Sequence, residues 1–291
     1  MRLYPCCMPI FRFSCLAAFL VASSISAEAQ APPESSQKPP PPVDSNLPRA
    51  QPPDASDDDP ITLRTIVPNI WKDQGRIYWA YPKALAHGHR LLPTIAFVAA
   101  TGALIAADQY ESPYFRRTTT FRRFNTGLSG TNTLLLTAGV PVVAYVVGLI
   151  KKDTYAQRTA LWTAEAVADS EVTAEVLKLV TRRARPENIR PNGNFGDTWT
   201  DSPTVAGGSF PSGHTIAAFS VATVMSRRYG RNHKWVPFVA YGLAATVGFS
   251  RVTSSAHNVS DVFVGAGLGY AISRFLVLGH HPRTKFPRPL S

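Results

Sequence analysis

The stretch from Phe210 to Met225, FPSGHTIAAFSVATVM, joins a turn to an apolar segment. Its second half is apolar and rich in alanine, which is typical of a buried helix. Pro211 and Ser212 are residue types that favour the first positions of a helix. The free backbone N–H groups at a helix N-terminus bind anions, and Gly213 lets a ligand approach the backbone closely. The stretch therefore predicts a helix with an anion site at its start.

Five further apolar stretches accompany this one, and alternating strand patterns are scarce. They cover residues 91–107, 133–150, 161–180, 236–249 and 262–278. With 45% hydrophobic residues in a chain of 291, there is enough apolar surface for a sizeable core. We therefore expect an all-α fold, a single helical bundle of about six core helices. Its domain covers residues 61–291, with the core at about 90–280.

The first 29 residues have the features of a signal peptide. Arg2 and Arg12 accompany the short apolar run Leu16–Ala22, and an A-x-A cleavage site ends at Ala29. All three cysteines lie within the first 15 residues, so the mature protein would contain none and would not depend on disulfides. We expect export to a periplasmic or other extracytoplasmic space. A membrane anchor that is never cleaved is the alternative interpretation.

Residues 30–60 differ in composition from the rest of the chain. They hold ten of its 25 prolines and include the acidic run Asp57–Asp59. Such a segment has too little apolar surface to offset the entropy lost on ordering, so we expect a Pro-rich disordered linker. A segment that binds a proline-recognising partner is the alternative.

The predicted helical domain is strongly basic. Residues 61–291 contain 26 Lys and Arg against 12 Asp and Glu, a net charge of +14. This charge implies an anionic partner, namely nucleic acid, anionic lipid or a phosphorylated substrate. Nucleic acid is the least suitable of the three for an exported protein, and we see no base-stacking motif. The sequence does not indicate an oligomeric state.

The apolar stretches raise the question of a membrane. Four carboxylates fall within the stretch 161–180, a density that is costly in lipid: Glu165, Asp169, Glu171 and Glu175. Pro141 and Arg274 interrupt two of the longer stretches. We therefore favour a soluble or peripheral domain, in contact with an anionic membrane, over a protein with six spans.

Three short blocks contain the side chains best suited to phosphate chemistry. Lys178 and Arg185 are seven residues apart, about two helical turns, so they project to the same side. His214 follows the predicted anion site, where it is placed for proton transfer. His257 and Asp261 are four residues apart, so the carboxylate can orient the imidazole. Each block alone has a structural interpretation (a basic helix end, a helix cap, a surface His–Asp contact), but their joint occurrence favours a site.

The sequence offers no further cluster of carboxylates for a metal. Neutralisation of a bound phosphate therefore falls to Lys178, Arg185 and Arg251. Arginine suits this role because its planar fork binds two phosphate oxygens at once. We expect a site without a metal.

Together the blocks resemble the signature of a known superfamily. They read Lys178-x6-Arg185-Pro186, Pro211-Ser212-Gly213-His214 and Ser250-Arg251-x5-His257-x3-Asp261, with 24 and 35 residues between successive blocks. This pattern is similar to the three-part signature of the type 2 phosphatidic acid phosphatase and vanadium haloperoxidase superfamily. Every signature position matches, and the helical pattern agrees with the family's all-helical domain.

The resemblance implies a role for each matching residue. His257 would be the nucleophile that forms a phosphohistidine, Asp261 would orient it, and His214 would act as general acid and base. The phosphate would be held by Lys178, Arg185, Ser212, Gly213 and Arg251. The family's phosphatases work without a metal, so no cofactor is expected. Arg182 and Arg183 lie between family positions and receive no role.

The implied function is an exported, metal-independent phosphatase that acts on a lipid phosphate, either phosphatidic acid-like or a polyprenyl diphosphate. A soluble nonspecific acid phosphatase is the second hypothesis. A haloperoxidase that holds vanadate on His257 is the third. A non-catalytic module that binds anionic lipid is the fourth.

Overall fold

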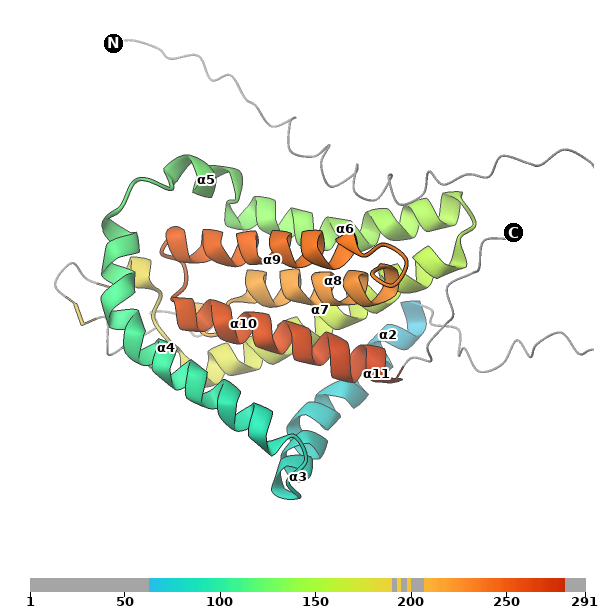
Figure 1. Cartoon of the computed structure of the whole chain (residues 1–291), viewed down its shortest axis with the longest axis horizontal. Helices are drawn as coiled ribbons and strands as arrows, with labels where there is room; N and C mark the ends of the chain where they lie inside the picture. The colour runs from blue at the N-terminus through green and yellow to red at the C-terminus, as the bar shows by residue number, and fades with distance from the viewer. Residues whose placement is uncertain (1–62, 190–192, 195–197, 200–206, 281–291) are drawn as a thin grey trace, which may run out of the picture. The chain divides into compact units, whose positions relative to one another are not determined.

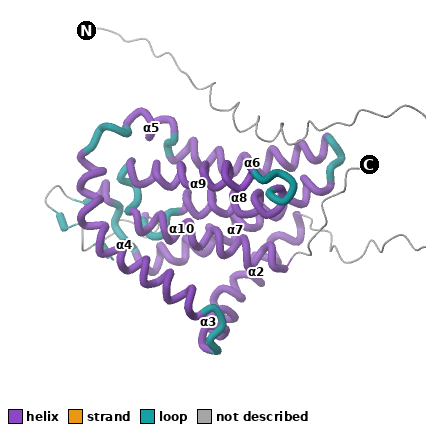
Figure 2. The backbone as a smooth tube through the Cα atoms, viewed as in Figure 1, coloured by secondary structure: helices purple, strands orange, loops and turns teal. Residues whose placement is uncertain are grey.

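The computed structural model describes residues 63–189, 193–194, 198–199 and 207–280. The signal peptide expected at 1–29 and the linker expected at 30–60 lie outside the described residues and stay predictions. Every regular element within the described residues is helical, as Figure 2 shows, and none is a strand. The all-α expectation is confirmed for this part of the chain.

The helices follow one another with short connections (Figure 1). In chain order they are α2 (Leu63–Gly75), the π-helical η1 (Arg76–Ala80), α3 (Tyr81–Ala86), α4 (Leu91–Arg117), α5 (Arg122–Gly127), α6 (Gly130–Ile150), α7 (Thr154–Thr181), the 3-10 turn η2 (Pro186–Asn188), α8 (Gly213–Tyr229), α9 (Trp235–Thr253), α10 (Val259–Ala271), the π-helical η4 (Ile272–Val277) and α11 (Leu278–His280). Five of the six expected stretches each fall in one long helix, and residues 262–278 run through α10 and η4 to the first residue of α11. The expected count of about six is too low, because it omits α2, α3 and α5.

Local sequence explains where several of these helices begin. Asp153 caps α7 by accepting a hydrogen bond from the Ala156 N–H at 3.1 Å. Asn258 and Asp261 form a capping box at the start of α10, in which the Asp261 carboxylate accepts from the Asn258 N–H at 2.8 Å. Asp261, the aspartate of the predicted histidine–aspartate pair, therefore also determines where α10 starts.

Helix α8 is the centre of the bundle. It packs against α6, α7, α9 and α10, and its Ile216 and Val224 side chains are completely buried. Two glycines of α10 allow the closest of these approaches. A Cβ on Gly265 would lie 2.8 Å from the Ser212 carbonyl, and one on Gly269 would overlap the Ile216 carbonyl. The N-termini of α8 and α10, which both carry signature residues, are held together by this contact.

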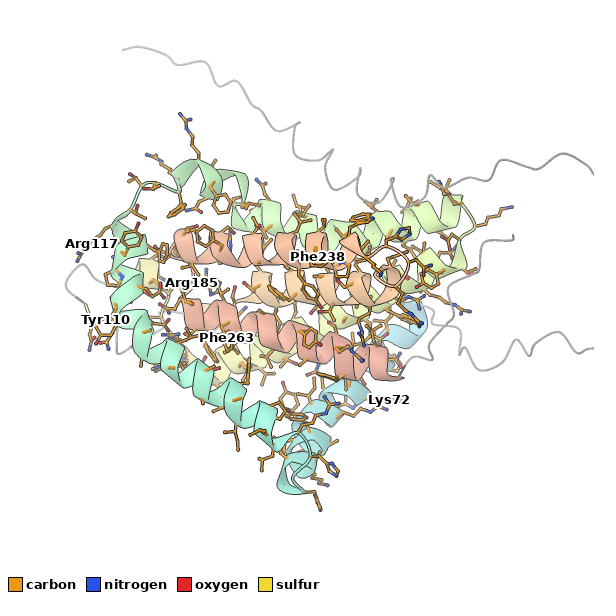
Figure 3. The ribbon with its side chains drawn as sticks, viewed as in Figure 1. Lys72, Tyr110, Arg117, Arg185, Phe238 and Phe263 are labelled. Carbon is orange, nitrogen blue, oxygen red and sulfur yellow. The ribbon has the colours of Figure 1, made fainter. Side chains whose placement is uncertain are left out.

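Helix α4 lies obliquely past α10, with its first turns near α3 and its last turns near α5 (Figures 1 and 2). The rings of Phe97 and Phe263 stack between the two helices at 5.1 Å. Much of the apolar surface on the outer helices is uncovered. Leu92 on α4 is 78% exposed, and Phe238 on α9 (Figure 3) is 81% exposed.

Three helical segments are long and apolar enough to cross a membrane: Leu91–Arg117, Gly130–Ile150 and Val259–Val277. The interruptions expected at Pro141 and Arg274 are wrong. Pro141 is buried inside the continuous helix α6, and Arg274 lies in η4, which continues α10 directly. The carboxylate-rich α7 is not among the three segments. The cost of carboxylates in lipid therefore applies to α7, and α8 and α9 are also not among the three segments.

Candidate active site

The fold brings the three signature blocks to one place, where the end of α7, the start of α8 and the turn between α9 and α10 meet. A Cβ on Gly213 would lie 3.2 Å from Lys178 Nζ. The Ser212 N–H donates to the Asp261 carbonyl at 3.0 Å. The α-carbon of Gly130, at the start of α6, lies beside both remaining groups, since a Cβ there would be 3.6 Å from Arg251 Nη1 and 3.6 Å from His214 Nε2.

His257 is held in one orientation. It is 4% exposed, and its Nδ1 lies 2.7 Å from the Ser209 carbonyl oxygen. Because a carbonyl only accepts, this bond places the proton on Nδ1 and leaves a lone pair on Nε2. Burial, the largest effect, lowers the pKa of His257, so the ring is neutral at pH 7. A neutral, fixed imidazole with an unprotonated Nε2 has the form that a nucleophile requires.

Asp261 stands behind His257, but it is not the nearest acceptor of the Nδ1 proton. Its Oδ2 lies 3.8 Å from Nδ1 and accepts from the Asn258 N–H instead. Its Oδ1 accepts from Arg183 Nη1 at 2.6 Å. The orientation of His257 thus depends on the Ser209 carbonyl as well as on the charge of Asp261.

Arg183 connects this aspartate to helix α4. The guanidinium is 1% exposed, donates from Nη2 to Asp108 Oδ2 at 2.7 Å and from Nη1 to Ser260 Oγ at 2.7 Å. Asp108 also accepts from the Ser260 hydroxyl and from its backbone N–H. Asp108, Arg183 and Asp261 form a fully buried network of alternating charge, in which each ion has several partners.

His214 lies on the other side of the site. Its Nε2 is 3.0 Å from the Gly130 carbonyl, which identifies Nε2 as the protonated nitrogen. Burial, followed by the positive charge of Arg251, lowers the pKa of His214 to about 4. This ring is therefore neutral at pH 7. An anion bound between His214 and the cations would raise that pKa.

The three expected cations differ in their surroundings. Arg251 is 4% exposed, and its Nη2 donates to the Leu128 carbonyl. Arg185 donates from Nε to the Gly207 carbonyl at 3.3 Å and is about one third exposed. Lys178 pairs with Glu175 at 2.6 Å.

Several groups of this site could not be found from the motifs. The carbonyls of Ser209, Leu128 and Gly130 orient His257, Arg251 and His214, but backbone groups leave no trace in composition. Asp108 could have been noticed in the sequence, because it is a carboxylate directly after the apolar stretch 91–107. Arg183 left none, because it stands among other basic residues.

The expectation that no carboxylate cluster exists is wrong. One ligand atom each of Asp73, Glu165 and Asp169 lies within 4.8 Å of the others, and all three residues are buried. The sequence did not reveal this cluster, because Asp73 lies on α2, far along the chain from Glu165 and Asp169 on α7. Glu165 is 13 residues from Lys178, about 20 Å along the helix, so the cluster is no part of the phosphate site.

The described helices thus gather three cations, a helix N-terminus and two neutral histidines, a set of groups whose chemistry suits an oxyanion. Residues 159–285 match the family model of the PAP2 superfamily. The resemblance of the three blocks is thereby confirmed, since all of them lie in the matched region.

Two known proteins are similar to parts of this chain. A lipid A 1-phosphatase of Porphyromonas gingivalis is 39% identical over 67 residues, which are 23% of this chain and 15% of that protein. The chain thus matches a small fraction of this relative's length. The crystal structure of the first transmembrane PAP2 type phosphatidylglycerolphosphate phosphatase from Bacillus subtilis has 22% sequence identity and a TM-score of 0.47. That match covers 67% of this chain and 98% of the other.

Proposed function

We propose that this protein is a metal-independent phosphatase that hydrolyses a lipid phosphate through a phosphohistidine. The observation that carries the proposal is the state of His257, a buried neutral ring whose Nδ1 is bonded to Ser209 and whose Nε2 is unprotonated. The PAP2 family match supports the same chemistry.

In the proposed reaction the substrate phosphate binds between Arg185, Arg251 and the N-terminus of α8. His257 Nε2 attacks the phosphorus, and the bond from phosphorus to the leaving oxygen breaks. His214, protonated in the complex, gives its proton to that oxygen. A water molecule then attacks the phosphohistidine, His214 takes its proton, and inorganic phosphate is released. The cations and the N–H groups of α8 stabilise the charge that develops on the equatorial oxygens.

A lipid is the proposed source of the phosphate. Three helical segments are apolar enough for a bilayer, and large apolar side chains are exposed on α4, α6 and α9. The similar stretch in a protein described as a lipid A 1-phosphatase supports a lipid substrate as well. We therefore propose a membrane-associated enzyme whose site faces the extracytoplasmic side, in keeping with the expected signal peptide.

The test is phosphate release by the purified protein with chelator present, wild type beside His257→Ala. Phosphatidic acid, a polyprenyl diphosphate and a chromogenic monoester serve as substrates. We expect turnover that is insensitive to chelator and falls at least 1,000-fold in the variant, on the order of a lost nucleophile. A folded wild type that released phosphate from none of the three would contradict the proposal.

A further inference from the structure

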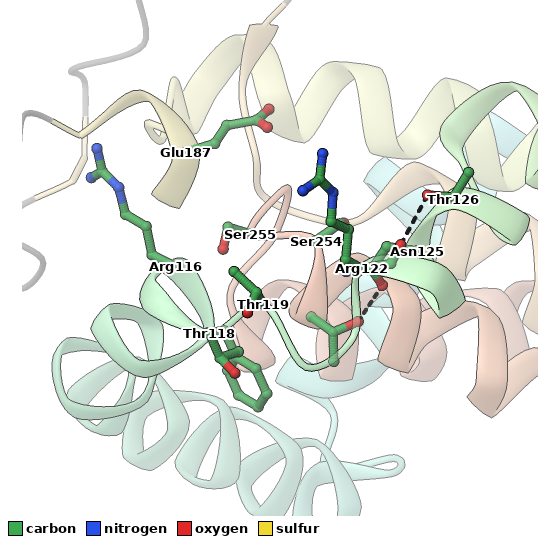
Figure 4. A pocket seen from close by; sticks show the side chains of 11 residues that line it. Arg116, Thr118, Thr119, Arg122, Asn125, Thr126, Glu187, Ser254 and Ser255 are labelled. Carbon is green, nitrogen blue, oxygen red and sulfur yellow. Dashed lines mark hydrogen bonds between the residues drawn. The ribbon is translucent and has the colours of Figure 1, made fainter. Parts of the chain in front are cut away.

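Beside the candidate active site lies an open cavity of about 580 Å³ (Figure 4). It is formed by the end of α4, the loop into α5, α5 itself, η2 and the turn after α9. All of its lining residues except Phe115 are polar or charged, and they include Arg116, Arg122, Asn125, Glu187, Ser254 and Ser255. None of these residues is a signature position, although Ser254 and Ser255 lie between Arg251 and His257 in the third block.

The cavity is joined to the phosphate site by direct contacts. Glu187 Oε1 lies 3.8 Å from Arg185 Nη1, and the Glu187 N–H donates to the Ser255 carbonyl at 3.0 Å. Ser254 Oγ donates to the carbonyl of Arg251 at 3.2 Å. A phosphate held by Arg185 and Arg251 would therefore lie next to the cavity, separated from it by one side chain.

Two arginines give the cavity its charge. Arg116 comes from the last turn of α4, where its Nη1 donates to the Pro186 carbonyl at 3.2 Å, and Arg122 comes from the start of α5. In Figure 4 the Glu187 carboxylate lies between the two guanidinium groups. Each arginine has a basic neighbour in sequence, Arg117 and Arg123, that does not line the cavity. The two lining positions thus bring positive charge from separate elements to one place.

Guanidinium groups surrounded by hydroxyl and amide donors suit an oxyanion, and they bind it in bidentate fashion. Glu187 repels an anion, but its charge is shared with Arg185, and it can accept from a hydroxyl group of the ligand. We infer that this cavity is a second subsite of the active site and binds a non-scissile anionic group of the substrate. The inference rests on the proposed function and narrows the substrate to molecules with two anionic groups.

The test uses two double variants with the same change of charge. Arg116→Ala with Arg122→Ala removes the arginines of the cavity, and Arg117→Ala with Arg123→Ala removes their exposed neighbours, of which Arg117 projects outward in Figure 3. Turnover of p-nitrophenyl phosphate is measured with butane-1,4-diol bisphosphate or butyl phosphate as competitor. Both competitors are soluble and differ only in the second phosphate.

We expect the bisphosphate to compete at least tenfold more strongly than butyl phosphate in the wild type and in the neighbour variant. The cavity variant should lose this preference while its turnover of p-nitrophenyl phosphate changes less than threefold. A preference that is absent from the wild type, or that survives in the cavity variant, would overturn the subsite. If the wild type turned over no phosphoester, the proposed function would fail instead. Calorimetric binding of the same two competitors would then decide the subsite separately.

Discussion

At the scale of single residues, the burial of His214 makes stability depend on pH. Its folded pKa of about 4 lies below the value near 6.5 of an unfolded histidine. Between these values the unfolded chain binds more protons, so stability falls as the pH falls from 6.5 towards 4. We expect His214→Asn to lose less thermal stability than the wild type when melting at pH 7 and pH 4.5 is compared. Equal losses in the two proteins would contradict the lowered pKa.

Arg183 is the common ion-pair partner of two buried carboxylates, Asp108 and Asp261. Its loss would leave Asp108 and Asp261 buried without their common partner, at a cost of about 3–5 kcal/mol. Arg183→Lys keeps the charge but cannot donate to both carboxylates in the same geometry. We expect this variant to fold, with kcat lowered about tenfold or more and KM nearly unchanged, because Arg183 positions Asp261 and touches no substrate. Arg182→Lys, at the exposed neighbouring position, is the matched control and should behave like the wild type.

At the scale of helices, the contact between α8 and α10 holds the two ends of the site together. A Cβ on Gly265 would press on the Ser212 carbonyl, next to the predicted phosphate-binding backbone. We expect Gly265→Ala to destabilise the fold by about 1–3 kcal/mol and to lower kcat, since the helices must separate. Gly242→Ala on α9 is the control, because a Cβ there meets nothing within 4 Å. It should be neutral or stabilising by up to about 1 kcal/mol. Thermal unfolding and steady-state kinetics of both variants check this, and equal effects would contradict it.

At the scale of the whole molecule, attachment to a membrane by charge and attachment through apolar surface predict different responses to salt. A basic domain bound by charge leaves anionic vesicles at about 1 M salt, where the screening length is about 3 Å. A domain bound through the apolar surface of α4, α6 and the α10–η4 segment stays with the vesicles. We expect the protein to float with vesicles in both low and high salt, and with neutral as well as anionic lipid. Release by salt would support the peripheral attachment that composition alone favours.

The sequence predicts the features that depend on local pattern, but not those that depend on contacts between distant segments. The long helices follow from their apolar stretches, because helix formation there depends largely on the local pattern of residues. The meeting of the three blocks was predicted only through their joint occurrence. What was missed depends on tertiary contact between distant segments, as in the pair Asp108–Arg183, separated by 75 residues, and the approach of Asp73 to Glu165. The joint orientation of His257 by the Ser209 carbonyl and Asp261 could not be predicted either, because no residue type marks the position of a backbone carbonyl that accepts such a bond.

The central claim is that His257 carries the phosphoryl group. The most direct measurement is to mix the protein with a substrate labelled in its phosphate, quench the reaction in alkali during turnover, and follow the label. A phosphohistidine contains a P–N bond that is stable in alkali and broken by acid, which distinguishes it from a phosphoserine. We predict label on the wild type at a peptide containing His257, lost in acid and absent from His257→Ala. Turnover that continued in His257→Ala, or a wild type that never acquired label, would contradict the account.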